Sequence, residues 1–374
     1  MTDRPRSAST TARSEQRILH FVTGGFSGAT QVAVDLALAG AQQQGMQTLL
    51  VLRRKRTTDA ARVQALRARG LQVEVLPGWS HLATLWALWR LCRAWRPDVL
   101  VAHGFPEHLL GRQAGVWAGV ARLVQVEHNS RERYGVWSLW RAHRLEARTA
   151  RVIAVSEGVR ESLIARGFSA GLIQAVPNGI DLDRFPAEQV LPLVSRVPGI
   201  VMSARFSRQK DHLSLIRALA ELKGRGLRPP LFFAGAGKDS YRREAEAEVV
   251  RLGLQGQVQF LGHHAAMPQL LMGHAICVLA THYEGMPLAL VEGMAAGCAC
   301  VASAVPGVQG VIEPERNGLL VPEGDASALA DALQRLLAEP DFAQGLASAA
   351  RQRAVQEHGL PLMRARYEQI LRSL

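Results

Sequence analysis

The segment Glu284-Gly285-Met286-Pro287-Leu288-Ala289-Leu290-Val291-Glu292 is the most informative stretch of the chain. A carboxylate ends a loop, glycine and proline follow, and an apolar helix that contains a second carboxylate begins. Proline at the first helical position has its φ angle already set, and it gives up an amide that would lack a partner anyway. The neighbouring amides point out of the helix start, where the macrodipole is positive. The segment therefore predicts an anion pocket between two carboxylates.

The two carboxylates suggest what the anion carries. Sugar hydroxyls need acceptors, and carboxylates accept hydrogen bonds strongly. A diphosphate with a sugar at each end has this pattern, so we place Glu284 near a transferred sugar and Glu292 near a ribose diol. The alternative for the same nine residues is an ordinary capped surface helix with two solvated glutamates.

Outward from this segment, short apolar runs alternate with helical patterns along most of the chain. The expected strands are Ile18–Thr23, Thr48–Arg53, Gln72–Leu76, Val99–His103, Leu123–His128, Arg151–Val155, Gly199–Ser203, Leu231–Ala234, Val258–Leu261, Ile276–Ala280 and Ala299–Ala302. Such βαβ alternation predicts an α/β fold with parallel sheets that helices cover on both faces.

A proline-rich break divides the pattern into two Rossmann-like halves in series. The predicted parts are a loose basic tail over 1–16, a first domain over 17–185, a linker over 186–199, a second domain over 200–358, and a C-terminal helix over 359–374 that packs back on the first domain. Ligands of such sheets bind beyond the carboxyl ends of the strands. We therefore expect the site in a cleft between two facing domains.

Composition places the chain among globular proteins. Of its 374 residues 48% are hydrophobic and 20% are charged, which is enough apolar material for a sizeable core. The four cysteines show no disulfide or metal-ligand spacing, which indicates a reducing compartment. The polar N-terminus lacks the apolar core of a signal peptide, and no stretch approaches the roughly 20 apolar residues of a membrane span. We expect a cytosolic protein.

The net charge of +12 is unevenly distributed. Residues 1–185 hold 25 basic and 14 acidic residues, and all seven tryptophans also lie there. This favours an anionic partner surface, and a membrane leaflet fits because Trp and Arg favour the interface. Nucleic acid is the rival, but no groove-reading or base-stacking motif is present. A high-arginine proteome alone would also explain the charge.

One helix is a candidate for that surface. Residues 81–96 predict an amphipathic helix, with Leu82, Leu85, Trp86 and Trp89 on one side and arginines elsewhere. The alternative is a core helix with a solvated basic edge.

Further candidate site residues follow the strands of the second half. Arg205 and Lys210 lie after its first strand, where they could clamp a diphosphate whose negative charge grows as a bond breaks; a solvated basic loop is the alternative. Gly235 and Gly237 end the next strand and permit close backbone approach to a ligand. After a further strand, Gly262 and His263 could line a base pocket, or be a plain strand-to-loop connection.

The first half offers weaker signals. Gly24, Gly25 and Gly28 form a glycine-rich turn that opens a helix, without the full order of a dinucleotide-binding motif. His103 and His128 end two strands; His128, with polar neighbours, is the better candidate for orienting a hydroxyl or moving a proton, although a lone histidine there is more often structural. Asp181-Leu182-Asp183 has the spacing of a metal-binding carboxylate pair, but a turn fits better. We predict no metal.

These motifs together resemble the retaining glycosyltransferases of family four, also called glycosyl transferases group 1, which have the GT-B fold. The likeness covers nearly the whole chain, and its most specific part is the pair of glutamates within Thr281–Val301. The matching segments, in the family's order, are the glycine turn at 24–28, Pro177-Asn178-Gly179-Ile180-Asp181, Arg205 to Lys210, Val258–Gly262, Ala295-Ala296-Gly297-Cys298 and Asn317-Gly318-Leu319-Leu320-Val321-Pro322.

The resemblance implies transfer of a sugar from a nucleotide-diphosphate sugar, with retention at the anomeric carbon and no bound metal or other cofactor. The first domain would bind the acceptor and the second the nucleotide sugar. Arg205 and Lys210 would hold the diphosphate, and His128 would lie near the donor sugar or acceptor. The amides of Gly285, Met286 and Leu288, around Pro287, would support the phosphates or the sugar. One departure follows the unit Gly307-Val308-Gln309, where the family often has glutamate and this chain has Gly310.

The family also suggests a setting. Members often act in cell-envelope or surface-polysaccharide assembly, so the implied acceptor is lipid-linked or a surface glycan, and the implied place is the inner face of the cytoplasmic membrane. Two alternatives remain: a GT-B epimerase or phosphorylase, and a catalytically silent membrane-docking module.

Overall fold

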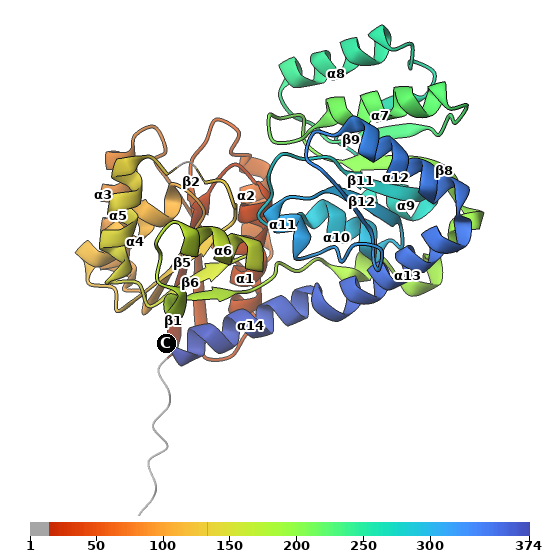
Figure 1. The fold of residues 1–374 in the computed structure, drawn as a ribbon. Coiled ribbons are helices and arrows are strands. Elements are labelled where there is room, and N and C mark those ends of the chain that lie inside the picture. The colour runs from red at the N-terminus through yellow and green to blue at the C-terminus, as the bar shows by residue number, and fades with distance from the viewer. Residues whose placement is uncertain (1–14, 133) are drawn as a thin grey trace, which may run out of the picture. The chain divides into compact units, whose positions relative to one another are not determined.

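The computed structural model describes residues 15–132 and 134–374 and contains two parallel sheets with helices around them (Figure 1). Most of the predicted basic tail, residues 1–14, lies outside the described residues. The strand order is β3-β2-β1-β4-β5-β6-β7 in the first sheet and β10-β9-β8-β11-β12-β13 in the second. The predicted α/β class with two Rossmann-like sheets is therefore confirmed.

The strands follow the apolar runs of the sequence. In the first sheet they are β1 (Gln16–Thr23), β2 (Met46–Arg53), β3 (Gln72–Leu76), β4 (Val99–His103), β5 (Arg122–Glu127), β6 (Arg151–Ala154) and β7 (Ile173–Ala175). In the second they are β8 (Val197–Ser203), β9 (Leu231–Ala234), β10 (Val258–Gly262), β11 (His274–Leu279), β12 (Ala299–Ser303) and β13 (Leu319–Val321).

Helices connect successive strands, as parallel pairing requires. Around the first sheet they are α1 (Gly28–Ala41), α2 (Ala60–Ala68), α3 (His81–Trp95), α4 (Glu107–Ala118), α5 (Val136–Glu146) and α6 (Glu157–Ala165). In the rest of the chain they are α7 (His212–Gly224), α8 (Asp239–Arg251), α9 (Met267–Gly273), α10 (Leu288–Ala295), α11 (Pro306–Gln309), α12 (Ala326–Ala338), α13 (Pro340–Glu357) and α14 (Leu360–Ser373).

Alternate residues of the central strands feed two separate cores on the faces of the first sheet. Leu19 and Leu49 join a cluster with α3 and α4, whereas Val22 and Leu50 join a cluster with α1 and α2. Successive side chains of a strand point to opposite faces, so a strand covered on both sides must be apolar throughout. This explains why these strands were visible as unbroken apolar runs.

The structure differs from the sequence expectations at several element ends. Strands β7 and β13 were not expected, because three residues are too few to form a recognisable run. Strand β8 begins at Val197, and short 3-10 turns occupy parts of the predicted linker. Pro287 is the N-cap of α10 rather than its first helical residue, and its carbonyl accepts hydrogen bonds from the amides of Leu290 and Val291 at 3.0 and 3.2 Å.

The predicted apolar face of α3 is divided in the structure. Leu85 is buried in the core with Leu88, whereas Leu82 and Trp86 are 78% and 57% exposed. Trp89 packs at the edge of the same core. The spacing of Leu82, Leu85, Trp86 and Trp89 places them on one side of the helix, but the core covers only part of that side. Leu85 is buried, whereas Leu82 and Trp86 form an exposed apolar side of α3.

The chain forms two compact units that each include discontinuous segments. The first contains the described residues up to Gln125 and Arg144–Ala150, and the second contains Val126–His143 and Arg151–Leu374. Residues 151–185 thus belong with the second unit by their contacts. The predicted domain boundaries remain predictions.

The C-terminal helix is fixed at its start. Gly359 pairs with Ile180 in a parallel bridge, and the Gly179 amide donates to Met363 Sδ at 3.2 Å. The predicted packing of this helix on the whole first domain stays a prediction. In the part of the chain that the structure describes, no helix is both long and apolar enough to cross a membrane.

Candidate active site

The loop of residues 280–287, here called the Glu284 loop, connects β11 to α10 and buries its carboxylate. Glu284 is only 5% exposed. Its Oε1 accepts a hydrogen bond from Thr281 Oγ1 at 2.8 Å and forms an ion pair with Lys210, and its Oε2 accepts from Gln209 Nε2 at 3.2 Å. A buried carboxylate needs this many donors to offset the loss of water. The side chain is therefore held in one position.

The loop after β8, residues 204–211, runs beside the Glu284 loop. Lys210 and Thr281 form an antiparallel bridge, the Asp211 amide donates to the Ala280 carbonyl at 3.0 Å, and the His282 amide donates to the Gln209 carbonyl at 2.9 Å. These bonds place the predicted cation Lys210 and the predicted carboxylate Glu284 at one site. The two residues are 74 positions apart in the chain, and both were predicted to bind the same ligand.

Gly285 is enclosed by backbone on two sides. A Cβ atom there would lie 1.9 Å from the His128 carbonyl oxygen, and a Cβ at Gly307 would lie 2.3 Å from the Gly285 carbonyl oxygen. Two hydroxyls fix the same stretch: Ser130 donates to the Glu284 carbonyl at 2.6 Å and Ser156 to the Gly285 carbonyl at 2.7 Å. Only glycine fits this position, because any side chain would collide with main-chain atoms.

The amides that follow are left without backbone partners. In the described chain, no carbonyl accepts a hydrogen bond from the amides of Gly285, Met286, Leu288 or Ala289. Unpaired amides at a helix start attract anions, because the helix dipole adds partial positive charge there. Met286 itself is buried and its Sδ accepts from the Asn178 amide at 2.8 Å. The loop thus has a fixed shape and free donors.

Glu292 lies one turn into α10 and pairs with Arg184 at 2.8 Å. Desolvation raises the pKa of Glu292, and the charge of Arg184 acts in the opposite direction without cancelling the effect. A partly desolvated carboxylate is a strong acceptor for a hydroxyl that can replace water. Arg184 was not among the predicted residues.

Arg205 and the glycines of β9 and β10 form a neighbouring group. The Gly235 amide donates to the Gly262 carbonyl at 2.7 Å, and a Cβ at Gly235 or Gly237 would lie 2.1 or 2.3 Å from a carbonyl oxygen of the 204–206 backbone. The close approach that glycine permits here is to the neighbouring loop. The two residues that could face a ligand, Arg205 and His263, are exposed, and among the described residues Arg205 has no carboxylate partner. The ligand roles of this group remain predictions.

His128 and Gly28 complete the predicted set. His128 is half-buried directly after β5, and desolvation lowers its pKa to about 3, so the imidazole is neutral at physiological pH. Its backbone touches Gly285 as described above. Gly28 begins α1 in the first unit, is exposed, and has open space where a Cβ would lie, so nothing near it requires glycine.

Several residues that shape the site were missed from sequence. Ser130 and Ser156 each follow a strand of the first sheet, Gln209 lies within the predicted basic loop, and Thr281 lies three residues before Glu284. Their positions after strands were the available signal. The metal-like spacing at residues 181–183 proved to be a 3-10 turn in which Asp181 accepts from the Asp183 amide at 3.2 Å. No cluster of three or more potential metal ligands occurs in residues 15–132 and 134–374.

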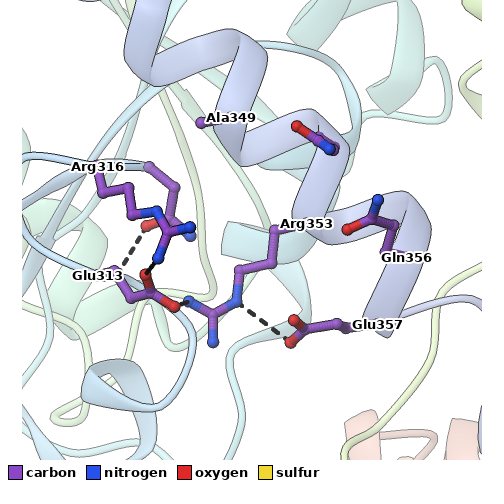
Figure 2. Close-up of a pocket in the computed structure, with 8 residues that line it drawn as sticks. Glu313, Arg316, Ala349, Arg353, Gln356 and Glu357 are labelled. Carbon is purple, nitrogen blue, oxygen red and sulfur yellow. Dashed lines mark hydrogen bonds and ion pairs between the residues drawn. The ribbon is translucent and has the colours of Figure 1, made fainter.

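A polar pocket elsewhere in the second unit, here called the Glu313 pocket, provides a contrast. Figure 2 shows it between α13 and the loop at residues 313–317, with a volume of about 160 Å³. Glu313 pairs with Arg316 at 2.7 Å and with Arg353 at 2.6 Å, and Arg353 also pairs with Glu357 at 3.2 Å. Asn317 holds the turn by accepting from the Glu313 amide at 2.7 Å. Since each arginine here has a carboxylate, the pocket presents no unmatched positive charge.

Comparison with known proteins assigns the chain to a family. The model described as "Glycosyltransferase Family 4" matches residues 26–184, and the model described as "Glycosyl transferases group 1" matches residues 183–353. Together they span residues 26–353, which include the second sheet and strands β2 to β7 of the first sheet.

Individual relatives agree with this result. The chain is 26% identical over 273 residues to an Escherichia coli UDP-Gal:alpha-D-GlcNAc-diphosphoundecaprenol alpha-1,3-galactosyltransferase, a match that spans 69% of this chain and 70% of the relative. It is 28% identical over 193 residues to a lipopolysaccharide 1,6-galactosyltransferase of Salmonella typhimurium, spanning 50% of this chain and 52% of the relative.

Solved structures share the fold at low identity. HepE of Anabaena in complex with UDP-glucose has a TM-score of 0.83 and 24% identity, and covers 96% of this chain and 100% of its own. The galactosyltransferase WaaB has a TM-score of 0.73 and 18% identity, with coverage of 96% and 100%. The chain therefore belongs to the glycosyltransferases of family four, enzymes of the GT-B fold that take a sugar from a nucleotide-sugar donor.

Proposed function

We propose that this enzyme is a retaining, metal-independent hexosyltransferase that transfers a sugar from a nucleoside-diphosphate sugar to a lipid-linked or cell-envelope glycan. One observation carries the proposal: the fixed Glu284 loop combines free helix-start amides with Lys210 at the same place. A leaving diphosphate needs both, because its negative charge grows as the glycosidic bond breaks. Arg205, exposed and without a carboxylate partner in the described chain, supplies a further cation from the same loop as Lys210.

The proposed reaction exchanges one glycosidic bond for another, and the basic residues and amides stabilise the charge of the leaving group. The bond between the anomeric carbon and the diphosphate oxygen breaks, the acceptor oxygen bonds to the same face of that carbon, and the acceptor proton passes to a phosphate oxygen of the leaving group. Lys210, Arg205 and the amides stabilise the departing charge, so no metal is required for that role. This course is the one that the family resemblance implies.

The carboxylates would hold the two sugars. Glu284 Oε1 already accepts from Lys210 and Thr281, whereas among the described residues Oε2 accepts only from Gln209, so Oε2 retains capacity for a sugar hydroxyl. Glu292 would accept from the ribose hydroxyls. His128 is neutral and could accept or donate a hydrogen bond to a hydroxyl without adding charge.

The acceptor class rests on relatives. The Escherichia coli relative is named for a diphosphoundecaprenol-linked sugar, and the Salmonella relative for lipopolysaccharide. The exposed apolar side of α3 supports contact with an anionic membrane leaflet, because Leu82 and Trp86 are exposed and the Arg90 guanidinium lies 4.8 Å from the Trp86 ring. Binding to anionic vesicles that declines with added salt would support this contact; no binding at low salt would contradict it.

A matched pair of variants tests the reaction. Thermal-shift screening with nucleoside diphosphates first identifies the base, since specific binding stabilises the folded state. Arg205→Ala should then lower the transfer rate about 100- to 1,000-fold without changing the melting temperature. Arg208→Ala, which removes another exposed cation from the same loop, is the control. Equal rates for the two variants would refute the role of Arg205, and sugar conversion without any acceptor would identify an epimerase.

A further inference from the structure

A second basic loop lies in the first unit, at the carboxyl end of β2. Residues 53–56 read Arg-Arg-Lys-Arg. The loop abuts the glycine-rich turn after β1: the Gly24 amide donates to the Arg53 carbonyl at 2.8 Å, and Thr58 Oγ1 occupies the space that a Gly24 side chain would need. Parallel sheets bind ligands beyond this end of their strands, so the loop is placed where a ligand would lie.

The charges of this loop are only partly matched. Glu107 is 2% exposed and accepts from Arg53 Nη1 at 3.0 Å, and the Lys55 ammonium lies 3.9 Å from the same carboxylate. One carboxylate thus faces two cations. Arg54 and Arg56 are exposed and, within the described residues, have no ion-pair partner. An excess of fixed positive charge remains at this point of the surface.

A cavity opens beside these cations, here called the Arg54 pocket. Its volume of about 440 Å³ falls in the range of roughly 300–1,000 Å³ usual for ligand pockets. The polar residues that line it are Arg54, Lys55, Thr58, Gln64, Arg67 and Glu74. The Arg67 guanidinium is oriented by two hydrogen bonds to the Val73 carbonyl, at 2.7 and 3.2 Å. Three cations, Arg54, Lys55 and Arg67, and one carboxylate, Glu74, thus line the cavity. The lining therefore favours a negatively charged group.

We propose that the Arg54 pocket binds the diphosphate of the acceptor, held by Arg54 and Lys55. The assignment rests on the proposed function, with its lipid-linked acceptor, and on the family resemblance, which implies that the first domain binds the acceptor. A diphosphate matches the pocket better than an uncharged glycan does, because a guanidinium can hold two phosphate oxygens at once and an ammonium adds a point charge. The pocket thus distinguishes acceptors by their anionic link rather than by their sugar.

The test uses the full chain and inorganic pyrophosphate as the probe. Calorimetric titration at low salt compares the wild type with Arg54→Ala and with Arg69→Ala, which removes one exposed cation from the end of α2 outside the pocket. Loss of a charge-assisted hydrogen bond predicts roughly tenfold or greater weakening for Arg54→Ala and none for Arg69→Ala. Equal weakening by both variants, or none by either, would overturn the proposal.

Two further arms separate this site from the donor site and from a membrane surface. In transfer assays Arg54→Ala should raise KM for a diphosphate-linked acceptor and leave donor KM and kcat unchanged.

If Arg205→Ala abolishes pyrophosphate binding while Arg54→Ala does not alter it, the pocket assignment fails and the proposed reaction stands. If Arg54→Ala weakens pyrophosphate binding but the wild type transfers no sugar, the pocket binds diphosphate and the proposed reaction is wrong. The diphosphate would then not belong to a glycosyl acceptor. Weaker binding of Arg54→Ala to phosphatidylglycerol vesicles, with pyrophosphate binding unchanged, would assign the cations to a lipid surface instead.

Discussion

The Glu284 loop and the Glu313 pocket both combine glutamate with cations, yet they differ in what is left over. In the Glu313 pocket each arginine is matched by a carboxylate, and Glu313 itself is 45% exposed at its side chain. In the Glu284 loop the carboxylate is buried and one cation is paired with it. Within residues 15–132 and 134–374, no carbonyl accepts from the amides of Gly285, Met286, Leu288 and Ala289. In the surface network the charged groups pair with one another, whereas the proposed binding site has hydrogen-bond donors that a ligand can use.

The comparison shows why residue type alone cannot identify a site. Both places contain glutamate paired with a basic side chain, and exposed pairs such as those of the Glu313 pocket contribute little to stability. What distinguishes the Glu284 loop is rigid packing around unused hydrogen-bond donors, which is the form that preorganised electrostatic stabilisation takes. The following changes test that distinction, beginning with the largest expected effect.

Replacing Gly285 with alanine should be the most damaging change. The new Cβ would lie 1.9 Å from the His128 carbonyl oxygen, so the loop must move away from its supports. We expect a loss of about 3 kcal/mol or more in the free energy of unfolding, together with loss of transfer. Urea denaturation and a transfer assay measure both.

Gly310→Ala is the matched control, because nothing lies within 4 Å of a Cβ at that position. It should leave both properties near wild type. A Gly285→Ala enzyme with normal stability and activity would show that the enclosure of this loop is not required.

Removing the cation from each region should give unequal costs. Lys210→Ala leaves the buried Glu284 with only neutral donors, and breaking a buried pair by removing one partner costs about 3 kcal/mol. Arg353→Ala leaves Glu313 with Arg316 and with water, so its cost should stay below about 1 kcal/mol. Chemical denaturation of both variants provides the measurement, and similar losses would remove the distinction between the two regions.

Neutralising Glu292 should affect binding more than stability. The folded-state pKa of Glu292 is raised above its ordinary value, so its contribution to stability is present below the unfolded pKa of about 4.5 and is lost as pH rises through the folded pKa. At neutral pH Glu292→Gln should therefore be at least as stable as the wild type, while binding of the nucleotide weakens.

The corresponding change Glu313→Gln breaks two arginine pairs and should lower stability slightly without altering nucleotide binding. Unfolding curves and nucleotide titrations at neutral pH compare the two variants. A Glu292→Gln enzyme that binds nucleotide normally would contradict contact with the ribose.

The smallest effect concerns pH. Desolvation lowers the pKa of His128 from 6.5 to about 3, so the folded state favours the neutral ring. Its contribution to stability is present above pH 6.5 and is lost as pH falls toward 3. His128→Gln should therefore lose less stability than the wild type between these pH values, and urea midpoints across the range measure the difference. Identical slopes would mean that His128 is not desolvated.

Much of the fold was predictable because the central strands are buried on both faces. β4 and β9 have the expected bounds because their apolar runs end sharply, and the edge strand β3 has the expected bounds although it alternates polar and apolar residues. The predicted site residues Lys210 and Glu284 meet, and His128 touches Gly285 through its backbone. Residues at the ends of parallel strands lie along one edge of the sheet, so their meeting follows from the topology.

Other features could not be predicted because they depend on contacts between distant segments. Arg184 pairs with Glu292 across 108 positions, and an arginine in a loop gives no signal of its partner. Ser130 and Ser156 act through single hydroxyls, and serine is common in any loop. The burial of Leu85 and the exposure of Leu82 and Trp86 in α3 could not be predicted, because the hydrophobic pattern alone does not reveal which residues meet the core.

The supports of the Glu284 loop have a consequence for engineering. Ser130, Ser156, Asn178 and Arg184 all precede the proline-rich break, although they hold a loop and helix from the second half. A chimera that exchanges halves at residue 185 would take these four supporting residues from one parent enzyme and the Glu284 loop from the other. A hybrid enzyme with a new acceptor-binding half should therefore take residues 126–143 and 151–184 from the same parent enzyme as its nucleotide-binding half. Otherwise we expect nucleotide binding to be lost.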